Sequence, residues 1–367
     1  MERGWLDEDA FGELVALCQT LPGPASSQLT IAVGRLRAGW AGALAAWLGF
    51  TLPSFALMTA LGIGVATASM PTTGPVAGAA HGLEVAAVAI VASAVLAMAR
   101  VLTPDAPRLV LAALAAAVLL AVSSPFAQVA VIAAGGLAGL AFLRGTAGPG
   151  SMDGARPLPP VAGHRSEAVA LLVAFVVVVV GSQLVATATG NPDIGLVAAF
   201  VRAGALVFGG GHVVLPLLDA GVVRPGWVTE NQFLAGYGAA QAVPGPLFSF
   251  AGFLGAVATV GPGGVLGAAA ATVAIFLPGA LLVLAALPVL GWLRGRPGVA
   301  AVLAGVNAAV VGVLAAALVN PVATGALTTP FSWLVAAAGT VLLVSGRVPP
   351  LAVVVGGAVA LGLASAV

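Results

Sequence analysis

A six-residue motif occurs twice in this sequence, once in each half of the chain. Residues 19–24 read Gln-Thr-Leu-Pro-Gly-Pro, and residues 241–246, 222 positions later, read Gln-Ala-Val-Pro-Gly-Pro. The first proline of each copy lacks the N–H that a continuing helix needs, and the second has a φ angle suited to the start of a new helix. Each copy therefore predicts a helix that is interrupted and then restarts, with free backbone N–H groups after the break.

The composition around these motifs places both breaks in a membrane. Of the 367 residues, 60% are hydrophobic and 7% are charged, whereas a soluble domain has about 25% charged residues. A chain this apolar cannot cover itself with a polar surface, and a membrane-spanning backbone must be helical or a closed barrel. The alternating strands of barrels are absent from the sequence, so it predicts an all-α polytopic membrane protein.

The hydrophobic stretches predict about 12 membrane segments. In the first half they are 8–33 (broken), 40–65, 82–100, 108–122 and 126–143. In the second half they are 195–218, 230–260 (broken), 262–290, 299–318, 332–345 and 348–366, and an extra segment, 167–188, connects the halves. Segments 108–122 and 332–345 are short for a full crossing, so each is expected to form a tight hairpin with its successor.

The motif belongs to a repeat that covers most of the chain. Gly82 to Val88 aligns with Gly305 to Val311 at nearly the same offset, and Pro53 aligns with Pro278 after a small insertion. Two homologous repeats are therefore expected. We predict a first repeat at 1–143, a cytoplasmic linker with a connecting membrane helix at 144–190, and a second repeat at 191–367.

Arginines are distributed unequally between equivalent loops of the two repeats. Because cytoplasmic loops are enriched in arginine, this distribution predicts that equivalent loops lie on opposite sides of the membrane and that the repeats are inverted. Random scatter of few charges is the alternative. The arginines on which this prediction rests are Arg35, Arg37, Arg100, Arg108, Arg294, Arg296 and Arg347.

Inverted repeats would bring the two Pro-Gly-Pro breaks together near the middle of the membrane. Helix N-termini carry partial positive charge and bind anions such as sulfate or phosphate. The N–H groups expected to be free are those of Ala25, Ser26, Ser27 and Gln28 after the first break, and of Leu247, Phe248 and Ser249 after the second. The serine hydroxyls could donate to the same anion. The alternative is that the prolines only kink helices whose backbone groups are satisfied by neighbours.

A second candidate group lies in segment 195–218. Three consecutive glycines before His212 suit either close helix packing or a local unwinding that exposes backbone groups to a ligand. Arg202 lies two helical turns earlier on the same face, and a bound dianion would offset its charge; an ion pair or a cap near the outer interface is the alternative. The full candidate binding set is Gln19, Pro22, Gly23, Pro24, Ala25, Ser26, Ser27, Gln28, Arg202, Gly209, Gly210, Gly211, His212, Gln241, Pro244, Gly245, Pro246, Leu247, Phe248 and Ser249.

Several function classes lack a signature in this sequence. No P-loop, dinucleotide motif or hydrolase elbow occurs, and the histidines show no metal-ligand spacing, so we expect neither an enzyme nor an ATP-driven pump, with no cofactor and no metal. The net charge of +1 gives no reason to expect nucleic acid as a partner. Proton coupling is left open, with Glu84, His212 and Asp219 as candidate carriers. The sequence carries no signal for oligomeric state.

The segments that bear the motifs resemble the chromate ion transporter (CHR) family. The resemblance covers Leu17 to Gln28 in the first half, and Ala205 to Leu218, Trp227, Phe233 and Gln241 to Pro246 in the second. It implies a long-chain, two-domain carrier that exports chromate, a tetrahedral dianion, across the inner (cytoplasmic) membrane without ATP. Carriage of sulfate or another oxyanion, and an inactive membrane subunit, are the alternatives.

One feature departs from the family pattern. The family's first half normally opens with a helix equivalent to 195–218, whereas this chain starts at Met1 beside Trp5. The resemblance therefore leads us to expect that this first helix is missing here, through either a late start or a real shortening. A real shortening would remove one wall of the paired site.

Overall fold

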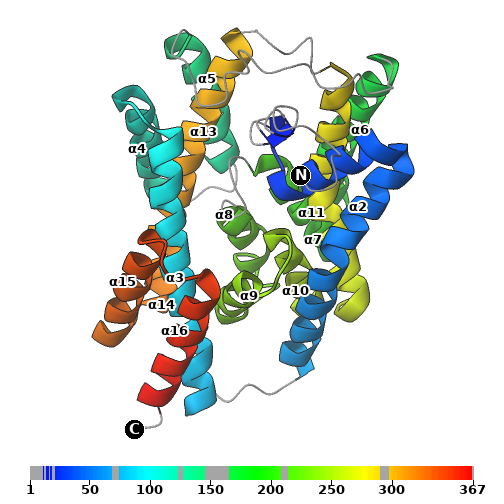
Figure 1. Cartoon of the computed structure of the whole chain (residues 1–367). Coiled ribbons are helices and arrows are strands. Elements are labelled where there is room, and N and C mark those ends of the chain that lie inside the picture. Colours follow the sequence, from blue (N-terminus) through cyan, green and yellow to red (C-terminus); the bar gives the residue numbers. More distant parts are fainter. Residues whose placement is uncertain are drawn as a thin grey trace.

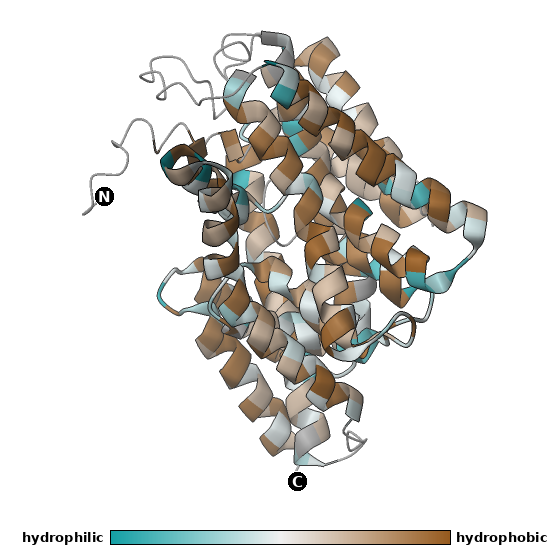
Figure 2. Ribbon diagram, turned by 90° about the vertical axis from the view of Figure 1, so that its right-hand side faces the viewer, coloured by the Kyte–Doolittle hydropathy of each residue, from teal (hydrophilic) through white to brown (hydrophobic). Residues whose placement is uncertain are grey.

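The computed structural model describes residues 11, 14, 15, 17, 18, 21–67, 74–122, 127–144, 165–207, 214–289 and 297–365. These residues form helices joined by turns, with no strand among them. Five of the described helices are long and apolar enough to cross a membrane. Hydrophobic residues run along the helices, while hydrophilic residues gather mainly at turns and helix ends (Figure 2). The expectation of an all-α polytopic membrane protein is confirmed.

In the first half the described residues 11, 14, 15, 17 and 18 are helical, Leu21 is not, and α2 (Ala25–Thr67) starts after the first Pro-Gly-Pro motif. The sequence of α2 contains a sharp turn, because Ala38 and Gly39 have non-helical backbone angles and φ of Gly39 is 63°. The turn folds α2 back on itself, so that Gly34 lies against Gly42. The helices that follow are α3 (Pro75–Leu102), α4 (Ala106–Ala121) and α5 (Ala127–Phe142).

The second half repeats this order after the connecting helix α6 (Arg165–Thr189) and an additional segment, α7 (Pro192–Leu206). α9 (Glu230–Ala242) precedes the second break. The elements equivalent to α2 are a 3-10 turn η3 (Leu247–Ser249), α10 (Phe250–Val257), and α11 (Gly264–Ala286) with η4 (Leu287–Val289). The remaining elements are α8 (Val214–Leu218), η2 (Asp219–Val223), α13 (Pro297–Ala317), η5 (Leu318–Ala323), α14 (Thr324–Ala326), α15 (Pro330–Val344) and α16 (Pro350–Ala364).

The predicted segments match these helices to within a few residues at most ends, with one correction. Segment 195–218 is not one helix, because α7 ends at Leu206 and α8 begins at Val214. Val207 is already extended, with φ of −77° and ψ of 120°. The three glycines that follow in the sequence are poor helix formers, which explains why α7 is not prolonged. Residues 208–213 lie outside the described residues.

Helices of the two halves pack against each other in reciprocal pairs. α16 packs along α3, and their equivalents in the other half, α5 and α13, pack along each other. In the same way, α15 packs on α3 and its equivalent α4 packs on α13. The closest approaches correspond as well, since Gly82 meets Gly357 and Gly305 meets Gly135. Two-fold-related bodies make reciprocal contacts of this kind.

The equivalent helices α2 and α11 also lie side by side. After its turn α2 runs downward in Figure 1, and α11 runs upward beside it. The direction of each half relative to a bilayer stays a prediction.

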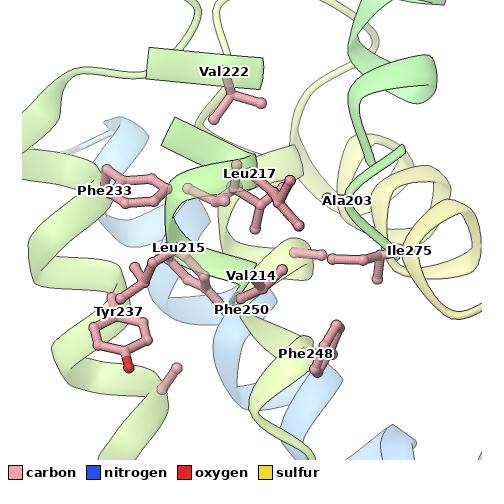
Figure 3. Packing of buried hydrophobic residues seen from close by; sticks show 14 of the residues in the cluster. Ala203, Val214, Leu215, Leu217, Val222, Phe233, Tyr237, Phe248, Phe250 and Ile275 are labelled. Atoms are coloured by element: carbon pink, nitrogen blue, oxygen red, sulfur yellow. The ribbon is translucent and has the colours of Figure 1, made fainter. Parts of the chain in front are cut away.

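The largest apolar core surrounds Phe250, the first residue of α10. Its ring lies 5.2 Å from that of Phe233 and 5.8 Å from that of Tyr237, both on α9, in edge-on arrangements. Leu215 and Leu217 of α8 fill the adjoining space, as Figure 3 shows. Aromatic pairs at such distances contribute about 0.5–1.5 kcal/mol beyond the burial of their area. This core holds α9 and α10 in place on the two sides of the second break.

The connecting helix α6 is attached to α2 by an ion pair. Arg35 Nη2 lies 2.8 Å from Glu167 Oε1, and the Arg35 guanidinium also lies 4.7 Å from the centre of the Trp40 ring. The side chains of Arg35 and Glu167 are 12% and 25% exposed. These contacts fix the start of α6 beside the turn of α2, while most of the outward face of α6 is apolar and exposed.

Candidate functional site

The first Pro-Gly-Pro motif interrupts the helix as predicted. Leu21, Pro22, Gly23 and Pro24 are not helical, and α2 begins directly after them. Gly23 has φ of 125°, a conformation that side chains rarely allow. Its N–H donates to the carbonyl oxygen of Val207 at 2.6 Å. The break is therefore joined to the end of α7, the helix that carries Arg202.

Gln28 closes the first break from inside α2. Its Nε2 donates to the carbonyl oxygen of Pro22 at 2.8 Å and to that of Gly279 at 3.1 Å. Its backbone N–H donates to the carbonyl oxygen of Pro24 at 2.9 Å, so the expectation that this N–H is free is wrong. The fully buried Gln28 side chain thus satisfies a carbonyl opened by the break and ties it to α11.

The second Pro-Gly-Pro motif also forms a break, between α9 and η3. Gly245 has φ of 139°, close to the value at Gly23. Ser249 donates to the carbonyl oxygen of Pro246 through both its N–H, at 3.0 Å, and its hydroxyl, at 2.8 Å. The expectation that these two donors face a substrate is therefore wrong. The reason is the tight 3-10 turn, which closes bonds one residue earlier than an α-helix does.

The first break lies against α11, and the second break lies against the part of α2 that follows its turn. A Cβ placed on Gly23 would lie 2.8 Å from Gly279 Cα, and one placed on Gly245 would lie 2.6 Å from the Ser54 side chain. Gly279 and Ser54 directly follow Pro278 and Pro53, the two prolines that the repeat aligns. The two breaks therefore make equivalent contacts, the first with α11 and the second with α2. That both open into one common space stays a prediction.

The donors that remain at the breaks are backbone N–H groups. Those of Ala25, Ser26 and Ser27 at the start of α2, and of Leu247 and Phe248 at the start of η3, have no acceptor among the described residues. The Ser27 hydroxyl is fully buried and also lacks a partner there. Such an arrangement can hold a tetrahedral oxyanion by neutral hydrogen bonds and helix dipoles.

Arg202 lies on α7, the helix whose end is hydrogen-bonded to the first break. Its Nη2 lies 3.5 Å from the point where a Cβ would stand on Gly221, in η2. It forms no ion pair within the described residues, where Asp219 pairs instead with Arg224 at 3.4 Å. A bound anion would supply the missing counter-charge. Gln19, Gly209, Gly210, Gly211 and His212, which the sequence also pointed to, lie outside the described residues.

Sequence reasoning missed a set of buried threonines between α2, α10 and α11. The hydroxyl oxygens of Thr59 and Thr272 lie 3.5 Å and 3.2 Å from the Cβ position of Gly252, and neither has a partner among the described residues. Thr51, near Ser54, is also buried without a partner. Each threonine stands alone in an apolar segment, so the sequence does not indicate that these side chains lie close together. No group of three metal-ligating side chains occurs within the described residues.

Residues 1–140 and 194–363 match the family described as Chromate transporter. A chromate transport protein of Pseudomonas aeruginosa is 30% identical over 268 residues, which are 70% of this chain and 59% of the relative. A probable chromate transport protein of Synechococcus elongatus is 27% identical over 71% of this chain and 62% of its own length.

A chromate transport protein of Cupriavidus metallidurans is 27% identical over 71% of this chain and 61% of its own length. The chain thus spans about three fifths of the length of these curated relatives. No solved structure matches it.

Proposed function

The chain belongs to the chromate transporter family, and from this membership we propose that it is a secondary active carrier that moves chromate out of the cell across the cytoplasmic membrane. The observation that carries the proposal is the pair of equivalent helix breaks, each with unpaired N–H groups at a helix start. Chromate has four oxygens in a tetrahedron, and several converging donors suit such an anion. Sulfate has the same shape and charge and is the competing substrate.

We further propose that the carrier works by alternating access between two inverted repeats, at 1–143 and 191–367, which 144–190 joins as a cytoplasmic linker and a connecting membrane helix. The reciprocal contacts of α3 with α16 and of α13 with α5 support this proposal. The contacts of the first break with α11 and of the second break with α2 also support it. In such carriers the site stays near the midplane while one half rocks against the other.

Protons are the proposed driving ion, and Glu84 is the proposed proton carrier. Glu84 lies within α3 and is 6% exposed, and it forms no ion pair among the described residues. The repeat places the neutral Asn307 at the equivalent position. A carboxylate inside a membrane helix is costly and marks proton pathways in carriers.

Uptake of labelled chromate into proteoliposomes tests the function. We expect wild-type protein to move chromate faster than protein-free liposomes, and faster when a pH gradient is imposed. Labelled sulfate is the parallel arm, and faster sulfate than chromate uptake makes sulfate the substrate. Folded protein that moves neither anion contradicts the proposed function.

Arg202→Ala is expected to weaken the apparent affinity for chromate by at least about tenfold, because a hydrogen bond to a charged group contributes about 1.5–3 kcal/mol. Concentration-dependent uptake measures this effect. Arg144→Ala is the matched control, since Arg144 lies exposed just beyond α5. Equal affinity in both variants removes Arg202 from the site.

Leu36→Cys and Ala258→Cys should be labelled from opposite sides of the membrane if the repeats are inverted. These positions precede the equivalent turns at Gly39 and Gly261, whose φ angles are 63° and 79°. The natural Cys18 is buried and is replaced by alanine in both variants. Labelling of both cysteines by an impermeant thiol reagent applied from one side contradicts the inverted topology.

A further inference from the structure

A pocket of about 320 Å³ opens beside the second break. It lies between the C-terminal half of α3, the end of α9 and the residues on both sides of the turn that joins α15 to α16. Its polar lining consists of Ser93, Arg100 and Gln241, and the rest is apolar. Because a water molecule occupies about 30 Å³ in the liquid, the pocket has room for a small hydrated anion.

The polar groups of this pocket are hydrogen-bond donors without a counter-charge. Arg100 is exposed in the last turn of α3 and forms no ion pair within the described residues. Gln241 Nε2 is buried, and the described part of the chain offers it no acceptor. The Ser93 hydroxyl donates to the carbonyl oxygen of Ile90 at 2.8 Å. Arg100 and Gln241 are therefore the groups left to bind a ligand, and both favour an anion.

An equivalent pocket in the other half shows that this arrangement is not a general consequence of the fold. It is lined by Val313, Ala316, Ala317 and Asn320, which correspond under the repeat to Ile90, Ser93, Ala94 and Ala97. Its volume is only about 40 Å³, and its cation, Arg224, is paired with Asp219 at 3.4 Å. Of these two pockets, only the one beside Gln241 combines this much space with a cation that forms no ion pair within the described residues.

We propose that the pocket lined by Arg100 and Gln241 is a second oxyanion-binding station, adjacent to the second break. Arg100 attracts the dianion and Gln241 passes it toward the free N–H groups of Leu247 and Phe248. Gln241 is the structural link, because it lies in the last turn of the helix that leads into the break. This inference rests on the proposed function, since it takes the transported oxyanion as the ligand.

The test measures chromate binding to purified protein in detergent alongside chromate uptake into proteoliposomes. Arg100→Gln is expected to raise the dissociation constant for chromate at least tenfold, and Arg100→Lys, which keeps the charge, is expected to restore most of the affinity. Arg144→Gln removes the same charge outside the pocket and should bind as wild type does. Equal binding by the wild type and Arg100→Gln overturns the inference.

A second pair of variants tests the same inference if the Arg100→Gln protein does not fold. Ala97 and Ala113 are both exposed, but only Ala97 lines the pocket. Ala97→Phe should lower chromate affinity at least tenfold by filling the pocket, whereas Ala113→Phe should not; equal affinities also overturn the inference. If the wild-type protein binds chromate but does not transport it, the proposed function is contradicted. The differences in affinity between the variants still test the second binding station in that case. Wild-type protein that does not bind chromate overturns both.

Discussion

Replacing Pro22-Gly23-Pro24 with three alanines is expected to abolish chromate transport while the protein still inserts into the membrane. Alanine favours a continuous helix, which would give the N–H groups of Ala25, Ser26 and Ser27 intrahelical acceptors. Losing two hydrogen bonds to a charged ligand, each of about 1.5 kcal/mol or more, lowers affinity more than about 100-fold. Labelled chromate uptake, normalised to the amount of folded protein, measures the loss.

The same replacement of Pro244-Gly245-Pro246 should have a similar effect, because the second break occupies the equivalent place in the other half. Pro104→Ala combined with Pro107→Ala is the matched control, since both prolines lie at the start of α4, away from the breaks. Normal uptake by well-expressed variants of both breaks contradicts the site assignment.

Gly82→Leu is expected to destabilise the protein by more than about 3 kcal/mol, beyond the usual cost of overpacking. A Cβ at this position would meet the backbone of Gly357 on α16, and backbone atoms cannot give way as a flexible side chain can. Gly305→Leu should destabilise to a similar extent, because Gly305 makes the equivalent contact with Gly135 on α5. Thermal unfolding in detergent measures both effects.

Gly49 and Gly64 provide controls for these leucine variants, because a Cβ on either would meet nothing within 4 Å. Leucine at these positions should leave the unfolding temperature nearly unchanged. If Gly82→Leu and Gly305→Leu unfold at the same temperature as these controls, the two halves do not pack in the reciprocal way described.

Much of the fold could be predicted from the sequence because its determinants are local. Proline removes a donor wherever it stands, and runs of apolar residues bounded by glycine and proline mark helices in a membrane. Both breaks were found in this way. The interruption of segment 195–218 was harder to predict, because glycines in a membrane segment are equally compatible with close helix packing.

The candidate site was less predictable, because its partners are distant in the sequence. Gln28 satisfies the first break by reaching Gly279, 251 residues away. At the equivalent position the second break has Phe250, which packs among aromatic rings instead. Two similar motifs are therefore held by different interactions. The sequence indicates Arg100 only as a marker of topology, because its place in a pocket depends on α9 and on the turn after α15.

We expect the two interrupted helices to bind one tetrahedral dianion at their N-termini. A structure of the protein determined with chromate, in which the anomalous signal of chromium locates the anion, measures this. Chromium is expected within hydrogen-bonding range of the N–H groups of Ala25 to Ser27 and of Leu247 and Phe248. Chromium bound only elsewhere, or continuous helices through both Pro-Gly-Pro motifs, would contradict it.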